Sequence, residues 1–370
     1  MRIVDGTGKF LIPGLWDMHI HGFLYVFSDF AGPLMIANGV TGARDMGYYI
    51  DTTLRWKRDI VAGKEIGPRL VVGARVDGPV NEARFIAHVK TAEDGTRAVD
   101  TLARRKDGRS RADFITIDGR IPREAYFSIA RESKRLNVAY VGAVPYSVTI
   151  AEASDSGQSG IEREADLVRA CTPYDATKCR SVMTTLARNH TWVTPTLVSY
   201  QAFAHGFDSA STHPELAKYV PGLVRGGWVR RASSVTKADS MKALNYFSFD
   251  RTRELKELGV KLLAGTDMPQ PFVYPGFSLH DELGLLVRSG LTPLEALQAA
   301  TINAAQALSM DGSLGTIEEG KVADLVLLDA NPLDNIANTR RIAAVIANGR
   351  LFDRTALKQL LQHVDSALKR

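Results

Sequence analysis

Apolar and polar positions along this chain follow two different patterns. Short runs rich in apolar and β-branched residues recur between longer stretches whose apolar residues follow a helical period. This alternation is typical of a parallel sheet built from strand–helix units. Eight such runs can be counted, at residues 11–21, 40–45, 69–73, 112–118, 138–144, 160–164, 192–197 and 261–267. Eight strand–helix units over roughly 250 residues predict the α/β class and a (β/α)8 TIM barrel.

The pattern changes after the last of these runs. Thr292 and Pro293 match the N-cap and the first turn of a helix. Residues 315–329 and 342–351 then read as strands separated by turn residues. These strands need partners in a sheet. Residues 2–10 are left to provide one, and without them the small sheet keeps an exposed edge.

The expected organisation therefore has three parts. A barrel is predicted over residues 11–311. Residues 1–10 together with 312–353 are predicted to form a small and apparently incomplete β-sandwich, and residues 354–370 a C-terminal helix. No internal repeat or phosphate-binding glycine loop is found.

Composition narrows the range of partners. The chain has 370 residues, 45% of them hydrophobic, which is enough for a large core. Its net charge of +5 is spread along the sequence, and the one basic cluster, residues 104–111, has no interleaved aromatic residues. That cluster reads as a solvated helix end and loop, so no nucleic-acid partner is expected.

The location of the protein is also predicted from its apolar segments. No apolar run approaches the ~18 residues that a membrane span needs, and the N-terminus lacks the pattern of a signal peptide. As written, the chain is expected to be cytoplasmic, with no membrane partner. Cys171 and Cys179 form no Cys-x-x-Cys unit and are expected to be thiols.

The first apolar run ends in a pair of histidines. His19 and His21 are separated by one residue, so in a strand their side chains point to the same face and can hold one metal ion. Asp17 shares that face. Taken alone, a His-x-His pair is as compatible with two exposed or hydrogen-bonded histidines.

Four segments in the right order carry a resemblance to a known family. They are Ile-Pro-Gly-Leu-Trp-Asp-Met-His-Ile-His at residues 12–21, Gly-Val-Thr-Gly-Ala-Arg-Asp-Met-Gly at 39–47, Ala-Gly-Thr-Asp at 264–267 and Gly-Lys-Val-Ala-Asp-Leu at 320–325. Together they resemble the amidohydrolase superfamily, in particular its imidazolonepropionase-related and prolidase-like enzymes. The resemblance implies a (β/α)8 barrel beside a small β-sandwich, with one or two divalent metals at the strand ends. Family members usually carry several dozen residues before the segment that resembles residues 4–10, so a truncated form or a reduced sheet is expected here.

The resemblance also implies a set of metal ligands, of which only part is present. His19, His21 and Asp267 match the residues that hold the first metal. The positions of the bridging lysine and of the two histidines that hold the second metal are occupied by Thr116, Ala143 and Arg163. A methyl group and a guanidinium cannot bind a metal, so the second metal is predicted to be absent.

The resulting prediction is a mononuclear amidohydrolase that cleaves a carbon–nitrogen bond of a small-molecule substrate. One divalent metal is expected, zinc first, with Fe, Mn or Co also suited to two histidines and a carboxylate. Asp267 is expected to be the catalytic acid/base. Arg163, His280 and Tyr274 are candidate substrate contacts, although His280 and Arg163 are equally compatible with ordinary pairing to nearby carboxylates. The alternative is an inactive member of the same fold, and a homo-oligomer is left open.

Overall fold

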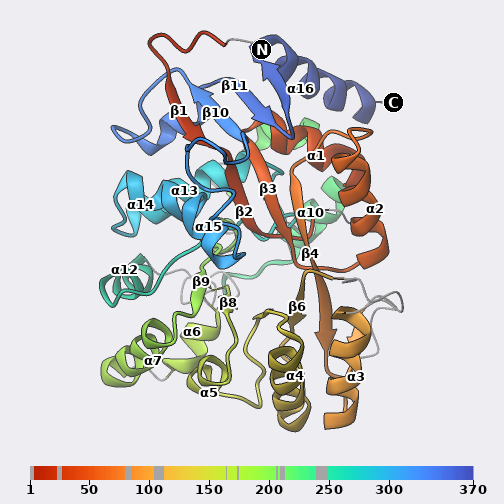
Figure 1. Ribbon diagram of the computed structural model, residues 1–370, viewed down its shortest axis with the longest axis vertical. Helices are drawn as coiled ribbons and strands as arrows, with labels where there is room; N and C mark the ends of the chain where they lie inside the picture. The colour runs from red at the N-terminus through yellow and green to blue at the C-terminus, as the bar shows by residue number, and fades with distance from the viewer. Residues whose placement is uncertain are drawn as a thin grey trace.

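The computed structural model describes residues 4–22, 27–79, 86–103, 112–163, 165–172, 175–205, 207–208, 213–238 and 249–369. Within them the chain forms a parallel barrel and a small antiparallel sheet (Figure 1). The basic cluster at residues 104–111 lies outside the described residues.

The barrel strands follow one another around the ring in chain order, as the α/β pattern predicts. They are β2 (Leu15–Ile20), β3 (Val40–Asp45), β4 (Arg69–Asp77), β6 (Phe114–Ile117), β7 (Tyr140–Gly142), β8 (Gly160–Glu162) and β9 (Trp192–Thr194), with the short β5 (Ala87–His88) added beside β4. The predicted eighth strand is an extended segment that closes the ring. Its Leu262 bridges to Val193 of β9, and its Met268 bridges to Ile20 of β2. The predicted TIM barrel is confirmed.

Helices cover the outside of the barrel. They are α1 (Ser28–Ala37), α2 (Ile50–Val61), α3 (Ala92–Ala103), α4 (Arg123–Leu136), α5 (Ile150–Asp155), α6 (Ala165–Ala170), α7 (Ala176–Arg188), α8 (Leu197–Ala204), α10 (Gly222–Ser234), α12 (Phe249–Glu257), α13 (Phe277–Arg288), α14 (Pro293–Ala299) and α15 (Ile302–Ala307), with the 3-10 helices η1 (Pro214–Tyr219) and η2 (Ile336–Arg340). As expected, Thr292 caps α14 and forms a capping box with Glu295.

The first predicted strand, residues 11–21, is in fact two strands in two sheets. β1 (Phe10–Pro13) pairs with β10 (Leu325–Leu328) in the small sheet, and β2 begins two residues later in the barrel. Pro13 has no N–H to donate to a ladder, so pairing can end there. Gly14 passes so close to Thr41 that a Cβ would lie 1.9 Å from its hydroxyl oxygen. The chain can therefore change sheets at this point.

The small sheet has the order β1, β10, β11 (Ile342–Ala347) and β12 (Arg350–Asp353), all antiparallel. Its first strand is Phe10–Pro13 and not residues 2–10, and β1 forms an edge of the described sheet. The predicted C-terminal helix is confirmed as α16 (Arg354–Leu368), which lies with the small sheet at one end of the molecule (Figure 1). The domain boundaries at residues 11 and 311 stay a prediction.

The two cysteines differ from expectation. Cys171 and Cys179 form a disulfide, with their Cα atoms 5.1 Å apart. α6 ends at Ala170 and α7 begins at Ala176, so Cys171 directly follows one helix and Cys179 lies near the start of the next, where their buried side chains meet. Disulfides persist mainly in oxidising compartments, so this bond does not support the predicted cytoplasmic location. In the part of the chain described here, no helix has the length and apolar character needed to cross a membrane.

Candidate metal centre

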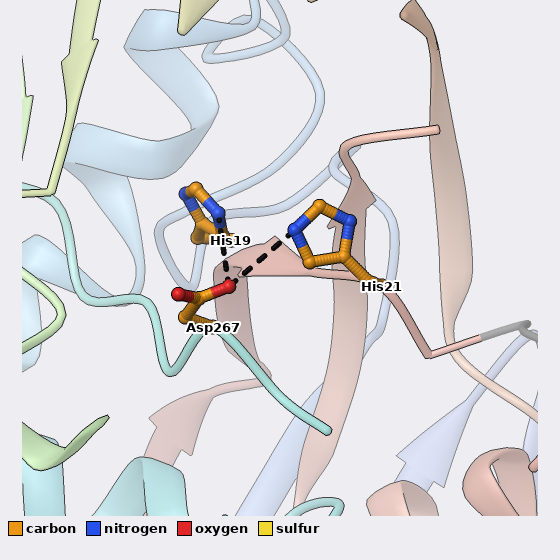
Figure 2. Close-up of side chains that lie close together, drawn as sticks. All are labelled: His19, His21 and Asp267. Carbon is orange, nitrogen blue, oxygen red and sulfur yellow. Dashed lines mark ion pairs between the residues drawn. The ribbon is translucent and has the colours of Figure 1, made fainter. Parts of the chain in front are cut away.

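Two backbone hydrogen bonds align the first and last segments of the barrel. The amide of Asp267 donates to the carbonyl of His19 at 2.8 Å, and the amide of His21 donates to that of Met268 at 2.7 Å. The side chains of His19, His21 and Asp267 consequently meet at the carboxyl end of the barrel (Figure 2). This is the end where TIM barrels carry their active sites.

The carboxylate of Asp267 faces both imidazoles. Its Oδ1 atom lies 3.4 Å from Nε2 of His19 and 3.4 Å from Nε2 of His21. The same Oδ1 atom is buried and has no hydrogen-bond partner. Potential ligand atoms of all three residues lie within 4.8 Å of one another. The sequence predicted this grouping, and the structure brings it together.

A hydrogen bond fixes the orientation of His19. Its Nδ1 atom lies 2.9 Å from Oε2 of Glu162, a buried carboxylate at the end of β8. Burial raises the pKa of Glu162, but Arg44 and His19 outweigh burial and hold that pKa below its usual value. Ionised Glu162 can only accept, so Nδ1 of His19 carries a proton and Nε2 points to Asp267. A carboxylate behind a histidine in this way is typical of metal ligands.

Arg44 completes this support from β3. Its guanidinium pairs with Glu162, and its Nε atom donates to the backbone carbonyl of Met18 at 2.7 Å. It also contacts the hydroxyl of Thr194 at 3.3 Å. Neither Arg44 nor Glu162 was predicted to support the site. A signal was available, because charged residues within apolar strand runs are rarely buried unless they are paired.

Asp17 lies below the histidines, and its carboxylate is hydrogen-bonded to protein atoms. It accepts hydrogen bonds from the hydroxyl of Thr266 at 2.7 Å, from its amide at 3.0 Å and from the amide of His19 at 3.3 Å. Burial raises the pKa of Asp17 to about 6, against the effect of these bonds. Asp17 therefore ties β2 to the closing segment.

Electrostatics within the centre depend on the balance between burial and pairing. Burial acts against the charged forms of His19 and Asp267, but their partners outweigh it. Asp267 and Glu162 raise the pKa of His19, and His19, His21 and Arg163 hold the pKa of Asp267 well below its usual value. For His21, burial dominates and lowers the pKa. In the absence of a metal, a proton on His19 can neutralise Asp267. A metal ion at the same place would displace that proton.

A cavity of about 420 Å³ opens beside the centre. It is lined by all three positions at which the family ligands are replaced, Thr116, Ala143 and Arg163, together with His19, His21 and Asp267. Asp118 also lines the cavity but pairs with Arg75, whose guanidinium stacks on Tyr48 at 4.3 Å.

Two expected substrate contacts lie elsewhere. Both ring nitrogens of His280 are bonded to protein atoms, to the hydroxyl of Thr339 at 2.9 Å and to the carbonyl of Asn38 at 3.1 Å. Tyr274 is buried in the main core, where its ring packs against Trp228 at 5.5 Å. Neither belongs to the described lining of the cavity, because helix packing after the eighth segment turns both side chains inward.

Comparisons with known proteins identify the family of this chain. The sequence profile of the amidohydrolase family matches residues 10–352. The chain belongs to the amidohydrolase family. Family membership places this amidohydrolase among the hydrolases of carbon–nitrogen bonds, as the resemblance predicts.

Among curated proteins, it is similar to the imidazolonepropionase of Rubrobacter xylanophilus, with 29% identity over 94% of this chain and 83% of that protein. The imidazolonepropionase of Symbiobacterium thermophilum is 36% identical over a shorter stretch, 28% of this chain and 25% of that protein. Among solved structures, a bottromycin amidohydrolase has a TM-score of 0.79 and 25% identity over 98% of this amidohydrolase and 81% of that chain. A putative prolidase from Bifidobacterium longum, with a TM-score of 0.73 and 24% identity over 98% and 86% of the two chains, shares the fold.

Proposed function

We propose that this protein is a mononuclear metal-dependent amidohydrolase. A single divalent ion is held by His19, His21 and Asp267, and the enzyme cleaves a carbon–nitrogen bond of a small amide, cyclic amide or dipeptide-like substrate. One observation carries the proposal. The buried Oδ1 atom of Asp267 faces two imidazole Nε2 atoms at 3.4 Å and has no hydrogen-bond partner. Such an arrangement of acceptor atoms calls for a cation between them.

The donor set supports a catalytic ion more than a structural one. Three protein ligands leave a position open for water, whereas structural zinc sites use four. Two histidines and one carboxylate suit zinc and also Fe(II), Mn(II) or Co(II). The cavity beside the three ligands provides the space that a substrate would need.

A single ion is favoured because the second set of ligands is missing. Thr116, Ala143 and Arg163 line the cavity where the family places a bridging lysine and two histidines. A methyl group has no lone pair, and a guanidinium is permanently cationic and repels a metal ion.

The roles of the residues follow from their positions. When bound, a divalent ion supplies an ionised water at neutral pH and polarises the scissile carbonyl. His19 and His21 hold and orient the ion, and Glu162 keeps His19 in the required tautomer. Asp267 accepts a proton from the attacking water and returns it to the leaving nitrogen, so that no net proton is gained or lost.

The relatives support this class of reaction. A protein named imidazolonepropionase is similar along most of the chain, and a structural neighbour named as a Xaa-Pro dipeptidase shares its fold. The replaced ligands favour the alternative of a barrel that has lost catalysis. A measurement of metal binding distinguishes the active hydrolase from the non-catalytic barrel.

Metal content of the purified chain is the test. After growth with added zinc, elemental analysis is expected to give about one equivalent per chain, and His19→Ala is expected to lose it because the ion keeps only two ligands. His363→Ala changes an exposed histidine on α16 and serves as the matched control. If the wild-type chain and the control bind no metal under these conditions, the active-enzyme proposal fails and the non-catalytic alternative stands.

A further inference from the structure

We infer that Arg163 is a catalytic residue that donates hydrogen bonds to the oxyanion formed when the amide carbonyl is attacked. The inference rests on the proposed function and extends it to a residue at a position where the family carries a metal ligand. It assigns the guanidinium the electrostatic task of a second cation, without a second ion.

The backbone places Arg163 at the carboxyl end of the barrel. It directly follows β8, and its amide donates to the carbonyl of Thr194 at 2.8 Å. Its φ of +76° lies in the left-handed region, which residues other than glycine rarely adopt. Strained backbone of this kind concentrates at functional sites. Here it accompanies a side chain that lines the same cavity as the three proposed ligands.

The guanidinium of Arg163 differs from the other arginines near the site. Arg44 is committed to Glu162 and the carbonyl of Met18, and Arg75 to Asp118. Arg169 is committed to Asp166 at 3.0 Å and to the carbonyl of Val144 at 2.6 Å.

For Arg163, by contrast, no carboxylate among the described residues lies within 4.0 Å. Burial opposes its charge, and attraction to Asp267, Tyr200 and Asp118 offsets burial and raises its pKa. Its N–H donors are therefore available to a ligand.

Asp267 acts electrostatically on Arg163. Attraction to Asp267 helps to raise the pKa of Arg163, yet no ion pair within 4.0 Å joins the two side chains in the described part of the chain. The small side chains of Thr116 and Ala143 line the same cavity as Arg163 and Asp267. A small amide bound in this cavity would lie among Arg163 and the three proposed metal ligands, since all four residues line it.

The charges around the cavity favour an anion at this place. Arg75 is balanced by Asp118, and Arg44 by Glu162. Arg163 is left as a fixed positive charge. The two positive charges of the proposed ion are only partly neutralised by the single negative charge of Asp267. Preorganised donors in such a site stabilise developing negative charge at little reorganisation cost.

The step balances without a further reactant. Oxygen of the attacking water bonds to the carbonyl carbon, its proton goes to Asp267, and the π electron pair moves to the carbonyl oxygen, which accepts N–H bonds from Arg163. When the carbon–nitrogen bond breaks, the pair returns to re-form the carbonyl, and the leaving nitrogen takes the proton from Asp267. Arg163 keeps all its protons throughout.

Binding of methylphosphonate, a tetrahedral anion, tests the inference independently of catalysis. Isothermal titration calorimetry is done on zinc-loaded and on chelator-treated protein, with acetate as the planar comparison. Loss of a charged hydrogen bond worth about 1.5–3 kcal/mol predicts that Arg163→Met weakens methylphosphonate binding by at least about tenfold in both states. Arg163→Lys should be intermediate. Arg169→Met, which removes a nearby committed arginine, should stay within about twofold.

Arg163→Gly provides a second measurement if Arg163→Met does not fold. Glycine adopts a φ of +76° without strain, and added guanidinium ion is expected to restore methylphosphonate binding to this variant. Wild-type affinity in both Arg163 variants overturns the inference. Equal affinity for acetate, with the same dependence on Arg163, also overturns it, since Arg163 would then hold a carboxylate. Arg163-dependent binding in a chain that takes up no metal would leave Arg163 as the anion-binding residue and refute the proposed function instead.

Discussion

Buried charged residues near the centre form ion pairs and hydrogen bonds between strands that are not neighbours in the sheet. Arg44 on β3 pairs with Glu162 on β8, and Glu162 orients His19 on β2. Removing one member leaves an unpaired charge in the interior, which is more costly than the pair is favourable. The order of the proposed metal ligand therefore depends on residues that touch no metal.

Glu162→Gln tests this dependence. If the NH2 group of the introduced amide faces Arg44, two hydrogen-bond donors meet, and if it faces His19, the proton of His19 is driven to Nε2 and the ligand is lost. We expect zinc affinity to fall by about 10–100-fold. Competition with a chromogenic chelator measures this affinity. Glu124→Gln, at an exposed position on α4, is the control, and unchanged affinity in Glu162→Gln would rule out the orienting role.

His280 gives a prediction about pH at the same scale. Burial lowers its pKa to about 3, with a smaller contribution from Arg340 and opposition from Asp281. The unfolded chain binds a proton at His280 near its ordinary pKa of 6.5, whereas the folded protein does not. Its contribution to stability is thus complete above pH 6.5 and is lost as the pH falls toward 3.

Urea denaturation between pH 4 and pH 7 measures this contribution. For one such group, the free energy of unfolding should decrease by at most about 1.4 kcal/mol for each unit by which the pH is lowered. His280→Gln should flatten this part of the profile, even if it lowers stability overall. His363→Gln, on the surface, should leave the slope as it is, and an equal slope in His280→Gln would contradict the assignment.

At the scale of elements, the closing segment of the barrel positions the centre. It lies against β2 so closely that Gly265 has no room for a side chain. A Cβ there would come within 2.6 Å of Thr194 Cγ2, 2.8 Å of His19 Cβ and 2.9 Å of the His19 amide nitrogen. Glycine is needed at this point because two backbones meet there.

Gly265→Ala should therefore disturb both stability and metal binding. Overpacking predicts a loss of about 1–3 kcal/mol, together with displacement of His19 and reduced zinc content. Chemical denaturation and elemental analysis check the two effects. Gly284→Ala is the control, because a Cβ in that part of α13 meets nothing within 4 Å and alanine favours a helix. Retention of full zinc content in Gly265→Ala would show that the segment tolerates movement.

At the scale of the molecule, the proposed ligands come from the first and the last strand segments of the barrel. His19 and His21 belong to its first strand and Asp267 to its eighth segment. They meet because a barrel brings its first and last strands together. The small sheet and α16 lie together at one end of the molecule (Figure 1). They carry none of the described cavity lining.

The sequence by itself determined the barrel and the three proposed ligands. Periodicity identifies strands and helices because each buries one face, and alternation along a strand places His19 and His21 on the same side. The sequence also showed that Thr116, Ala143 and Arg163 replace the family's metal ligands, since this depends only on residue type. The split of residues 11–21 was missed, because an uninterrupted apolar run does not reveal which sheet each half joins.

Only the tertiary structure decided which charges meet. Glu162 lies 143 residues from His19, and Cys171 after α6 bonds to Cys179 in α7. Neither contact follows from local sequence pattern. The inward positions of His280 and Tyr274 and the uncommitted guanidinium of Arg163 likewise depend on packing between distant elements. The physical reason is that sequence periodicity reports which face of an element is buried, whereas the partner on that face is chosen by how the elements close on one another.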